Sequence, residues 1–89
     1  MDAKVFLVDD DPEFIELMTY QLRHHGFAVV SAAHGLDAVP AACQHQPDVI
    51  LLDVMLPELD GLSVCEEIHR NSATVRIPVI IEVERWPSG

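Results

Sequence analysis

The apolar residues fall into short continuous runs, separated by longer segments with helical spacing. Residues 5–8 and 49–52 are continuous apolar runs, and each is followed directly by Asp. Runs of this length without polar alternation are typical of parallel strands that are covered on both faces. Residues 27–32 and 79–81 form two further strand candidates.

Three segments between these runs have the spacing of amphipathic helices. The first is predicted over residues 12–25, because Pro12 is favoured in a first helical turn and Gly26 is a typical C-terminal stop. A second is expected over residues 36–46, where Pro40 should displace the start or kink the helix. A third should follow Gly61 and end near residue 71. The apolar positions that support the first and third helices are Phe14, Leu17, Met18, Leu22, Leu62, Val64, Cys65 and Ile68.

The resulting order is βαβαβαβ, which predicts an α/β fold with a parallel sheet and right-handed crossovers. The first strand ends in Asp9 and Asp10, and the third ends in Asp53. Because ligands of such sheets bind at the carboxyl ends of the strands, we expect these three carboxylates to meet at one site.

Composition limits the classes of partner. The chain of 89 residues fits a single domain, and 49% of its residues are hydrophobic. Its net charge of −10 and its five scattered basic residues argue against direct nucleic-acid binding. No apolar run approaches the roughly 20 residues that span a bilayer, so neither a membrane anchor nor a signal peptide is expected. Two cysteines are too few for a disulfide framework, which favours a reducing, cytoplasmic setting.

Two motifs carry a family resemblance. Residues 7–12 (LVDDDP) resemble the acidic turn of response-regulator receiver domains, and residues 48–61 (DVILLDVMLPELDG) resemble their phosphorylation-site strand and turn. The likeness continues through residues 76–80 (RIPVI) and covers nearly all of residues 3–81. It implies a flavodoxin-like doubly wound parallel sheet and a role in two-component signalling.

The resemblance also implies a chemistry for the acids. Asp53 would be the phosphoacceptor, taking a phosphoryl group from a sensor histidine kinase, a phosphotransfer protein or a small phosphodonor. Mg²⁺ would bind Asp10 and Asp53 directly, the Met55 carbonyl, and Asp9 mainly through water. This donor set suits Mg²⁺, which prefers oxygen ligands and retains several waters. Such a protein is a phosphoryl acceptor rather than a turnover enzyme.

The sequence departs from the family pattern near its end. A full receiver domain continues through a fifth strand and two further helices, so residues 1–81 resemble a truncated receiver domain followed by a divergent tail, residues 82–89. The family uses a Ser or Thr at the end of the fourth strand and a Lys at the end of the fifth to hold and read the phosphoryl group. Val83 stands near the position of that Ser or Thr, and the only lysine of this sequence is Lys4. Signal output is therefore expected to be impaired.

Other interpretations remain open at this point. Asp9, Asp10 and Asp11 could form a solvated helix start, with Asp11 as the N-cap. The Asp9-x-Asp11 spacing is also similar to a haloacid-dehalogenase phosphatase motif, although later motifs of that family are missing. Cys65 and His69 share a helical face, but two ligands are too few for a closed zinc site.

The chain could instead be an interaction module derived from a receiver domain. An edge strand at residues 79–81 predicts association with a second copy of the chain. A two-fold homodimer is expected, because it is the commonest closed oligomer.

Overall fold

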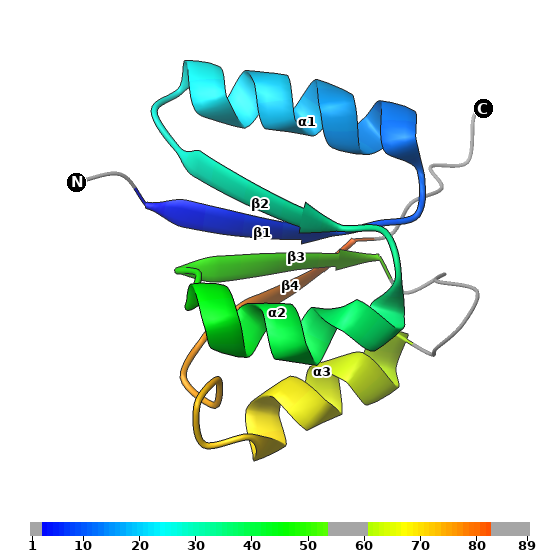
Figure 1. Ribbon diagram of the computed structural model, residues 1–89, viewed down its shortest axis with the longest axis vertical. Coiled ribbons are helices and arrows are strands. Elements are labelled where there is room, and N and C mark those ends of the chain that lie inside the picture. Colours follow the sequence, from blue (N-terminus) through cyan, green and yellow to red (C-terminus); the bar gives the residue numbers. More distant parts are fainter. Residues whose placement is uncertain (1–2, 54–60, 83–89) are drawn as a thin grey trace.

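The computed structural model describes residues 3–53 and 61–82, with the side chain of residue 82 left out (Figure 1). The strands and helices alternate along the chain in the predicted order. They are β1 (Lys4–Val8), α1 (Pro12–His24), β2 (Ala28–Ala32), the 3₁₀ turn η1 (Gly35–Asp37), α2 (Ala38–His45), β3 (Val49–Asp53), α3 (Gly61–Arg70) and β4 (Val79–Glu82).

The four strands form one parallel sheet in the order β2-β1-β3-β4. α1 lies on one face of the sheet, and α2 and α3 lie together on the other (Figure 1). The chain places β2 on one side of β1, and then β3 and β4 on the other side. β1 and β3 are therefore neighbours in the middle of the sheet. The predicted flavodoxin-like α/β fold is confirmed over the described residues.

The main core lies between the sheet and the α2–α3 layer. Alternate residues of the two central strands face these helices, because side chains of a strand point to opposite faces in turn. Burying each large side chain stabilises the fold by about 1.5 to 3 kcal/mol. The core residues, all fully buried, are Phe6, Val8, Ile50 and Leu52 from the strands and Ala38, Ala42, Val64 and Ile68 from the helices.

Both ends of α1 are set by local chemistry. Asp11 is its N-cap, and its side chain accepts hydrogen bonds from the backbone N–H groups of Glu13 and Phe14. After the C-cap His25, Gly26 adopts a φ of +93°, a backbone conformation that glycine tolerates best. The helix predicted over residues 12–25 therefore ends one residue earlier.

Pro40 displaces the start of the second helix rather than kinking it. The predicted segment opens with η1, and the α-helix begins at Ala38. Pro40 then occupies the first turn of α2, where a backbone N–H would have no helical partner. The C-cap Gln46 closes this helix with a left-handed φ of 47°.

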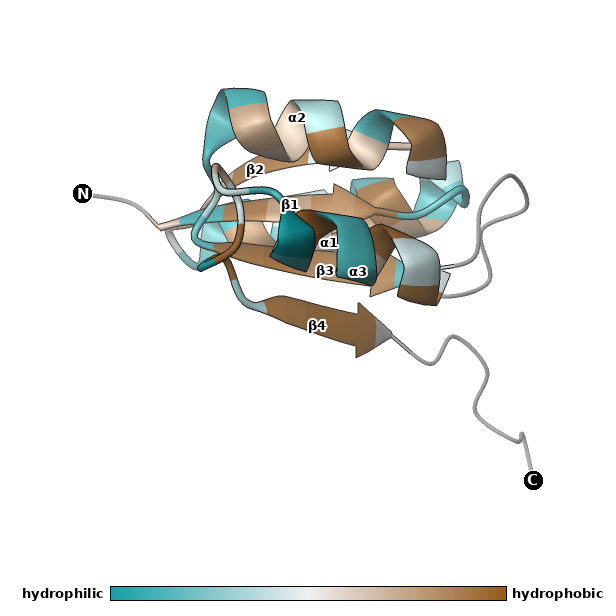
Figure 2. Ribbon diagram, turned by 90° about the horizontal axis from the view of Figure 1, so that it is seen from below, coloured by the Kyte–Doolittle hydropathy of each residue, from teal (hydrophilic) through white to brown (hydrophobic). Residues whose placement is uncertain are grey.

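Coverage of the α1 face of the sheet decreases towards β4. Leu7 of β1 is 1% exposed, Leu51 of β3 is half-buried, and Ile80 of β4 is 53% exposed. Figure 2 shows this apolar strand at the margin of the sheet. None of the helices in the described ranges combines the length and the hydropathy required to cross a bilayer.

Candidate functional site

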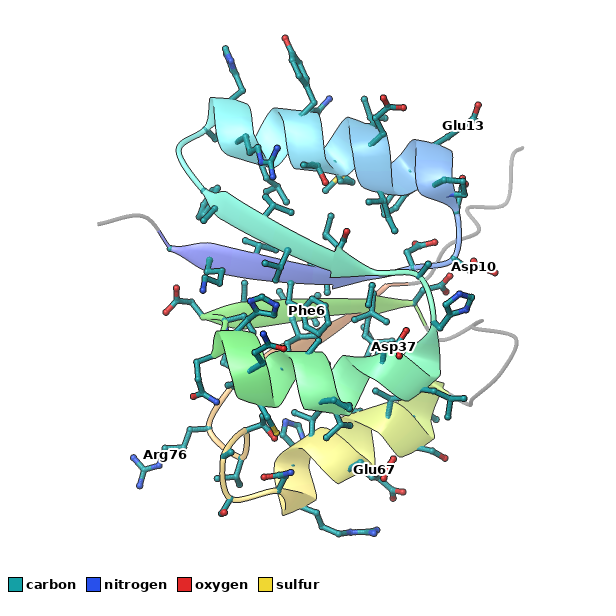
Figure 3. All side chains as sticks on the ribbon, viewed as in Figure 1. Phe6, Asp10, Glu13, Asp37, Glu67 and Arg76 are labelled. Atoms are coloured by element: carbon teal, nitrogen blue, oxygen red, sulfur yellow. The ribbon has the colours of Figure 1, made fainter. Side chains whose placement is uncertain are left out.

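Strand register brings Asp9 and Asp53 together. Val8 pairs with Leu52 in the parallel ladder between β1 and β3, so the next residue along each strand lies at the same level. Both acids are buried, with exposures of 3% for Asp9 and 1% for Asp53. Asp10 follows in the turn that leads into α1 and is exposed to solvent at the same edge of the sheet (Figure 3).

The three carboxylates converge closely enough to share one cation. One oxygen each from Asp9, Asp10 and Asp53 lies within 4.8 Å of the others. Ionised carboxylates at this separation repel one another, and a bound cation relieves the repulsion. Because hard divalent cations prefer oxygen ligands, the donor set fits Mg²⁺.

Hydrogen bonds fix the position of Asp9. Its Oδ1 accepts the backbone N–H of Asp11 at 2.9 Å, and its own backbone N–H donates to the carbonyl of Ala32 on β2 at 3.1 Å. The first bond is a local turn in which an Asp side chain binds the N–H two residues ahead. This hydrogen bond was not predicted from the sequence, although Asp is a residue type that commonly forms such a turn.

The three consecutive Asp residues 9–11 therefore have two different roles. Asp11 caps α1 with Oδ1 at 3.0 Å from the N–H nitrogen of Glu13, whereas Asp9 and Asp10 belong to the cluster with Asp53. The helix-start interpretation is correct for Asp11 alone. Its capping role also explains the Asp9-x-Asp11 spacing without a phosphatase motif.

Some residues named from the sequence lie elsewhere. Met55 and Val83 are outside the described residues. Lys4 lies at the opposite edge of the sheet, at the amino end of β1, where its Nζ donates to the carbonyl of His45 at 3.0 Å. Within residues 3–53 and 61–82, no other group of three or more His, Cys, Asp or Glu residues could hold a metal ion.

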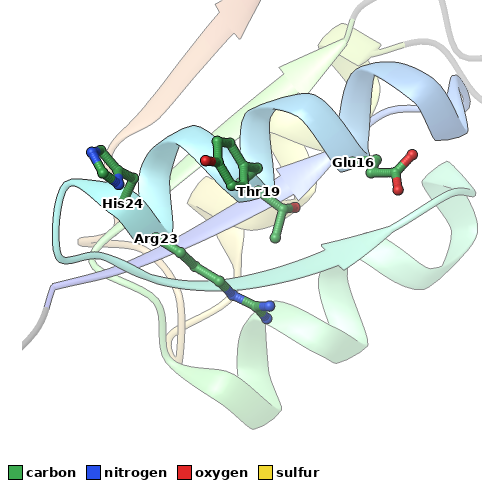
Figure 4. A pocket seen from close by; sticks show the side chains of 5 residues that line it. Glu16, Thr19, Arg23 and His24 are labelled. Atoms are coloured by element: carbon green, nitrogen blue, oxygen red, sulfur yellow. The ribbon is translucent and has the colours of Figure 1, made fainter.

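A separate hollow of about 530 Å³ runs along the surface of α1 (Figure 4). Among the described residues, its lining comes from this one helix, whereas the acidic cluster precedes the helix. These described lining residues do not converge from several elements, as the polar groups of a ligand site usually do. The lining residues are Glu16, Thr19, Tyr20, Arg23 and His24.

Comparison with known proteins identifies the family of this chain. A family model described as the response regulator receiver domain matches residues 5–84. The chain is 38% identical over 78 residues to the DNA-binding dual master transcriptional regulator RpaA of Synechocystis sp., covering 88% of this chain and 32% of that protein. It is also 38% identical over 79 residues to Protein PilH of Pseudomonas aeruginosa, covering 89% of this chain and 65% of that protein. The chain thus spans about a third to two thirds of the length of these relatives.

Solved structures agree with the sequence relatives. The receiver domain of the sensor histidine kinase PA1611 from Pseudomonas aeruginosa, which has a magnesium ion coordinated in its active site cleft, superposes with a TM-score of 0.88 at 32% identity, covering 100% of this chain and 73% of that one. The chemotaxis response regulator CheY4 of Vibrio cholerae gives a TM-score of 0.86 at 28% identity, covering 91% and 68% of the respective chains.

Proposed function

We propose that this chain, which belongs to the response regulator receiver domain family, accepts a phosphoryl group on Asp53. The observation that carries the proposal is the convergence of the Asp9, Asp10 and Asp53 carboxylates within 4.8 Å at the ends of β1 and β3. Receiver domains are signalling modules of two-component systems rather than turnover enzymes. The proposed role is accordingly that of a phosphoryl acceptor.

In the transfer, a carboxylate oxygen of Asp53 attacks phosphorus and forms an acyl phosphate. The bond between phosphorus and the donor atom breaks at the same time, and the electron pair leaves with the donor, an imidazole if the donor is a phosphohistidine. β3 sets the approach, because Asp53 is the last residue of a strand hydrogen-bonded on both sides. Positioning of the acceptor and stabilisation of charge are the main contributions a protein makes to phosphoryl transfer.

Mg²⁺ is part of the proposal. Asp10 and Asp53 would be direct ligands and Asp9 would act mainly through water, with the Met55 carbonyl as a further ligand from outside the described residues. When bound, the cation would neutralise charge on the phosphoryl oxygens. The magnesium in the cleft of the PA1611 receiver domain supports this assignment, as does the all-oxygen donor set of this chain.

The proposed donors are a sensor histidine kinase or a phosphotransfer protein, the partners with which receiver domains interact. The proposal places the chain in the cytoplasm, where its two free thiols, Cys43 and Cys65, would stay reduced. The negative net charge argues against direct binding to nucleic acid, so any such contact would belong to another part of a longer protein or to a partner.

Self-association is a second candidate function. Ile80 projects from β4 with 53% of its surface exposed, on the sheet face where coverage by α1 decreases. An exposed apolar residue on a strand at the margin of a sheet favours pairing with a second copy. We propose a two-fold homodimer through this strand, either alongside phosphorylation or as the function of a chain that is not phosphorylated.

The test of acceptor chemistry is the intact mass of the protein during incubation with acetyl phosphate and Mg²⁺. Wild type is expected to gain one phosphoryl group, and the gain should disappear in Asp53→Asn and fall strongly with EDTA in place of Mg²⁺. Asp37→Asn is the matched control, because Asp37 is exposed and makes no capping hydrogen bond through its side chain. Equal phosphorylation of wild type and Asp53→Asn would refute the proposal, and a wild type without any phosphoryl gain would favour the interaction module.

A further inference from the structure

Two side chains on α3 bring a sulfur and a nitrogen ligand together, on the helix layer rather than at the acidic edge of the sheet. The Sγ atom of Cys65 lies 3.8 Å from Nδ1 of His69, within hydrogen-bonding distance for sulfur. These residues are one helical turn apart, and a helical side chain leans back towards the N-terminus, so the ring of His69 reaches over Cys65. The pair is separate from the acidic cluster.

The separation of the two ligand atoms matches a chelate. A tetrahedral zinc ion with a Zn–S bond of about 2.3 Å and a Zn–N bond of about 2.05 Å would hold the two ligand atoms about 3.5 Å apart. The observed 3.8 Å differs by a few tenths of an ångström, within the range of a small rotation of either side chain. No change of the helix backbone is required.

The surroundings of the pair suit a cation that binds thiolate. Cys65 is half-buried and packs against the core, which restricts the position of its sulfur, whereas His69 is exposed and leaves the site open to solvent. The nearest acid along the helix, Glu66, lies 4.0 Å from Arg70 in an ion pair on the surface. Cys65 and His69 belong to no group of three potential ligands among the described residues.

We propose that Cys65 and His69 form a bidentate site on α3 for a thiophilic divalent cation such as Zn²⁺, with Sγ and Nδ1 as its protein ligands. Binding replaces the thiol proton by the metal and releases that proton to solvent, so the affinity falls as the pH is lowered. Water completes the coordination. Because the chain supplies only two ligands, the affinity should be well below that of a closed structural zinc site.

The test is titration of the reduced protein with Co²⁺, a spectroscopic substitute for Zn²⁺, in the presence of excess Mg²⁺ to occupy the acidic cluster. A thiolate ligand produces a sulfur-to-cobalt charge-transfer band in the near ultraviolet, which oxygen ligands do not give. Wild type should develop this band with a fitted stoichiometry of one Co²⁺ per chain, and excess Zn²⁺ should displace it.

Three variants identify the ligands. Cys65→Ser should abolish the band, and His69→Ala should weaken Co²⁺ binding by about tenfold or more, since metal affinity depends on both ligands. Cys43→Ser is the matched control, because Cys43 is the other half-buried free cysteine and lies on α2. It should leave the titration unchanged.

Three results would overturn the proposal: no band in wild type at millimolar Co²⁺, loss of the band in Cys43→Ser, or an affinity in His69→Ala within twofold of wild type. His69 is exposed, so its variant should fold even if Cys65→Ser does not. Circular dichroism of each variant checks this directly.

Discussion

Replacing Asp53 with Asn should stabilise the protein when no divalent cation is present. Asp9 and Asp53 are both buried, and their facing oxygens lie within 4.8 Å of each other. At 4.8 Å, the upper limit of this distance, two unit charges repel by about 3.5 kcal/mol at an effective dielectric constant of about 20. Asn keeps the shape of the side chain, removes the charge and adds an N–H donor that can face Asp9.

Screening by salt and local relaxation reduce this figure, so we expect Asp53→Asn to raise the free energy of unfolding by about 1 to 3 kcal/mol. In a domain of this size, each kcal/mol corresponds to a rise in Tm of about 4 to 8 °C. Mg²⁺, in contrast, should stabilise wild type more than the variant. Wild type should gain about 1.4 kcal/mol at a cation concentration ten times the Kd, and the variant should gain much less.

The assay is urea unfolding at low ionic strength, with EDTA and then with Mg²⁺, for wild type, Asp53→Asn and the control Asp37→Asn. Asp37 lies outside the cluster, and its variant should respond to Mg²⁺ as wild type does. The reasoning fails if Asp53→Asn is no more stable than wild type in EDTA, or if Mg²⁺ stabilises both proteins equally.

Three further changes test the fold around the site. Asp11→Ala removes the N-cap of α1 and should lower the free energy of unfolding by about 1 kcal/mol in urea unfolding, a cost that Asp11→Ser should largely restore. Thr74→Val removes the buried hydrogen bond of 2.6 Å from Oγ1 to the Ile68 carbonyl and should cost about 1 to 3 kcal/mol, whereas an unchanged urea midpoint would show that this bond contributes nothing. Ile80→Lys should shift the proposed homodimer to monomer in light scattering across dilution, and a wild type that is monomeric at every concentration would contradict the dimer.

The two central strands were predictable because each contains a continuous apolar run. Parallel strands that are covered on both faces need apolar residues at every position, and residues 5–8 and 49–52 satisfy this. The site followed from the same pattern, because the Asp residues directly after these runs must meet at one edge of a parallel sheet. Asp9, Asp10 and Asp53 do meet there.

The surroundings of α1 were not predictable in the same way. Its apolar positions mark the face that turns towards the sheet, yet none of its residues is buried and Leu17 is 54% exposed. Helical periodicity identifies an apolar face, but it does not say how much of that face a neighbouring element covers. The hydrogen bond from the Asp11 N–H to the Asp9 side chain was also missed, because the run of acids identifies Asp11 as an N-cap but does not show which backbone N–H the Asp9 side chain binds.

The most direct test of the central claim is to locate the phosphoryl group in the chain. After incubation of wild type with Mg²⁺ and acetyl phosphate, peptide mapping by tandem mass spectrometry should find a hydroxylamine-sensitive acyl phosphate on Asp53 and on no other residue. A phosphoryl group on a histidine or on another acid, with Asp53 unmodified after prolonged incubation, would contradict the account.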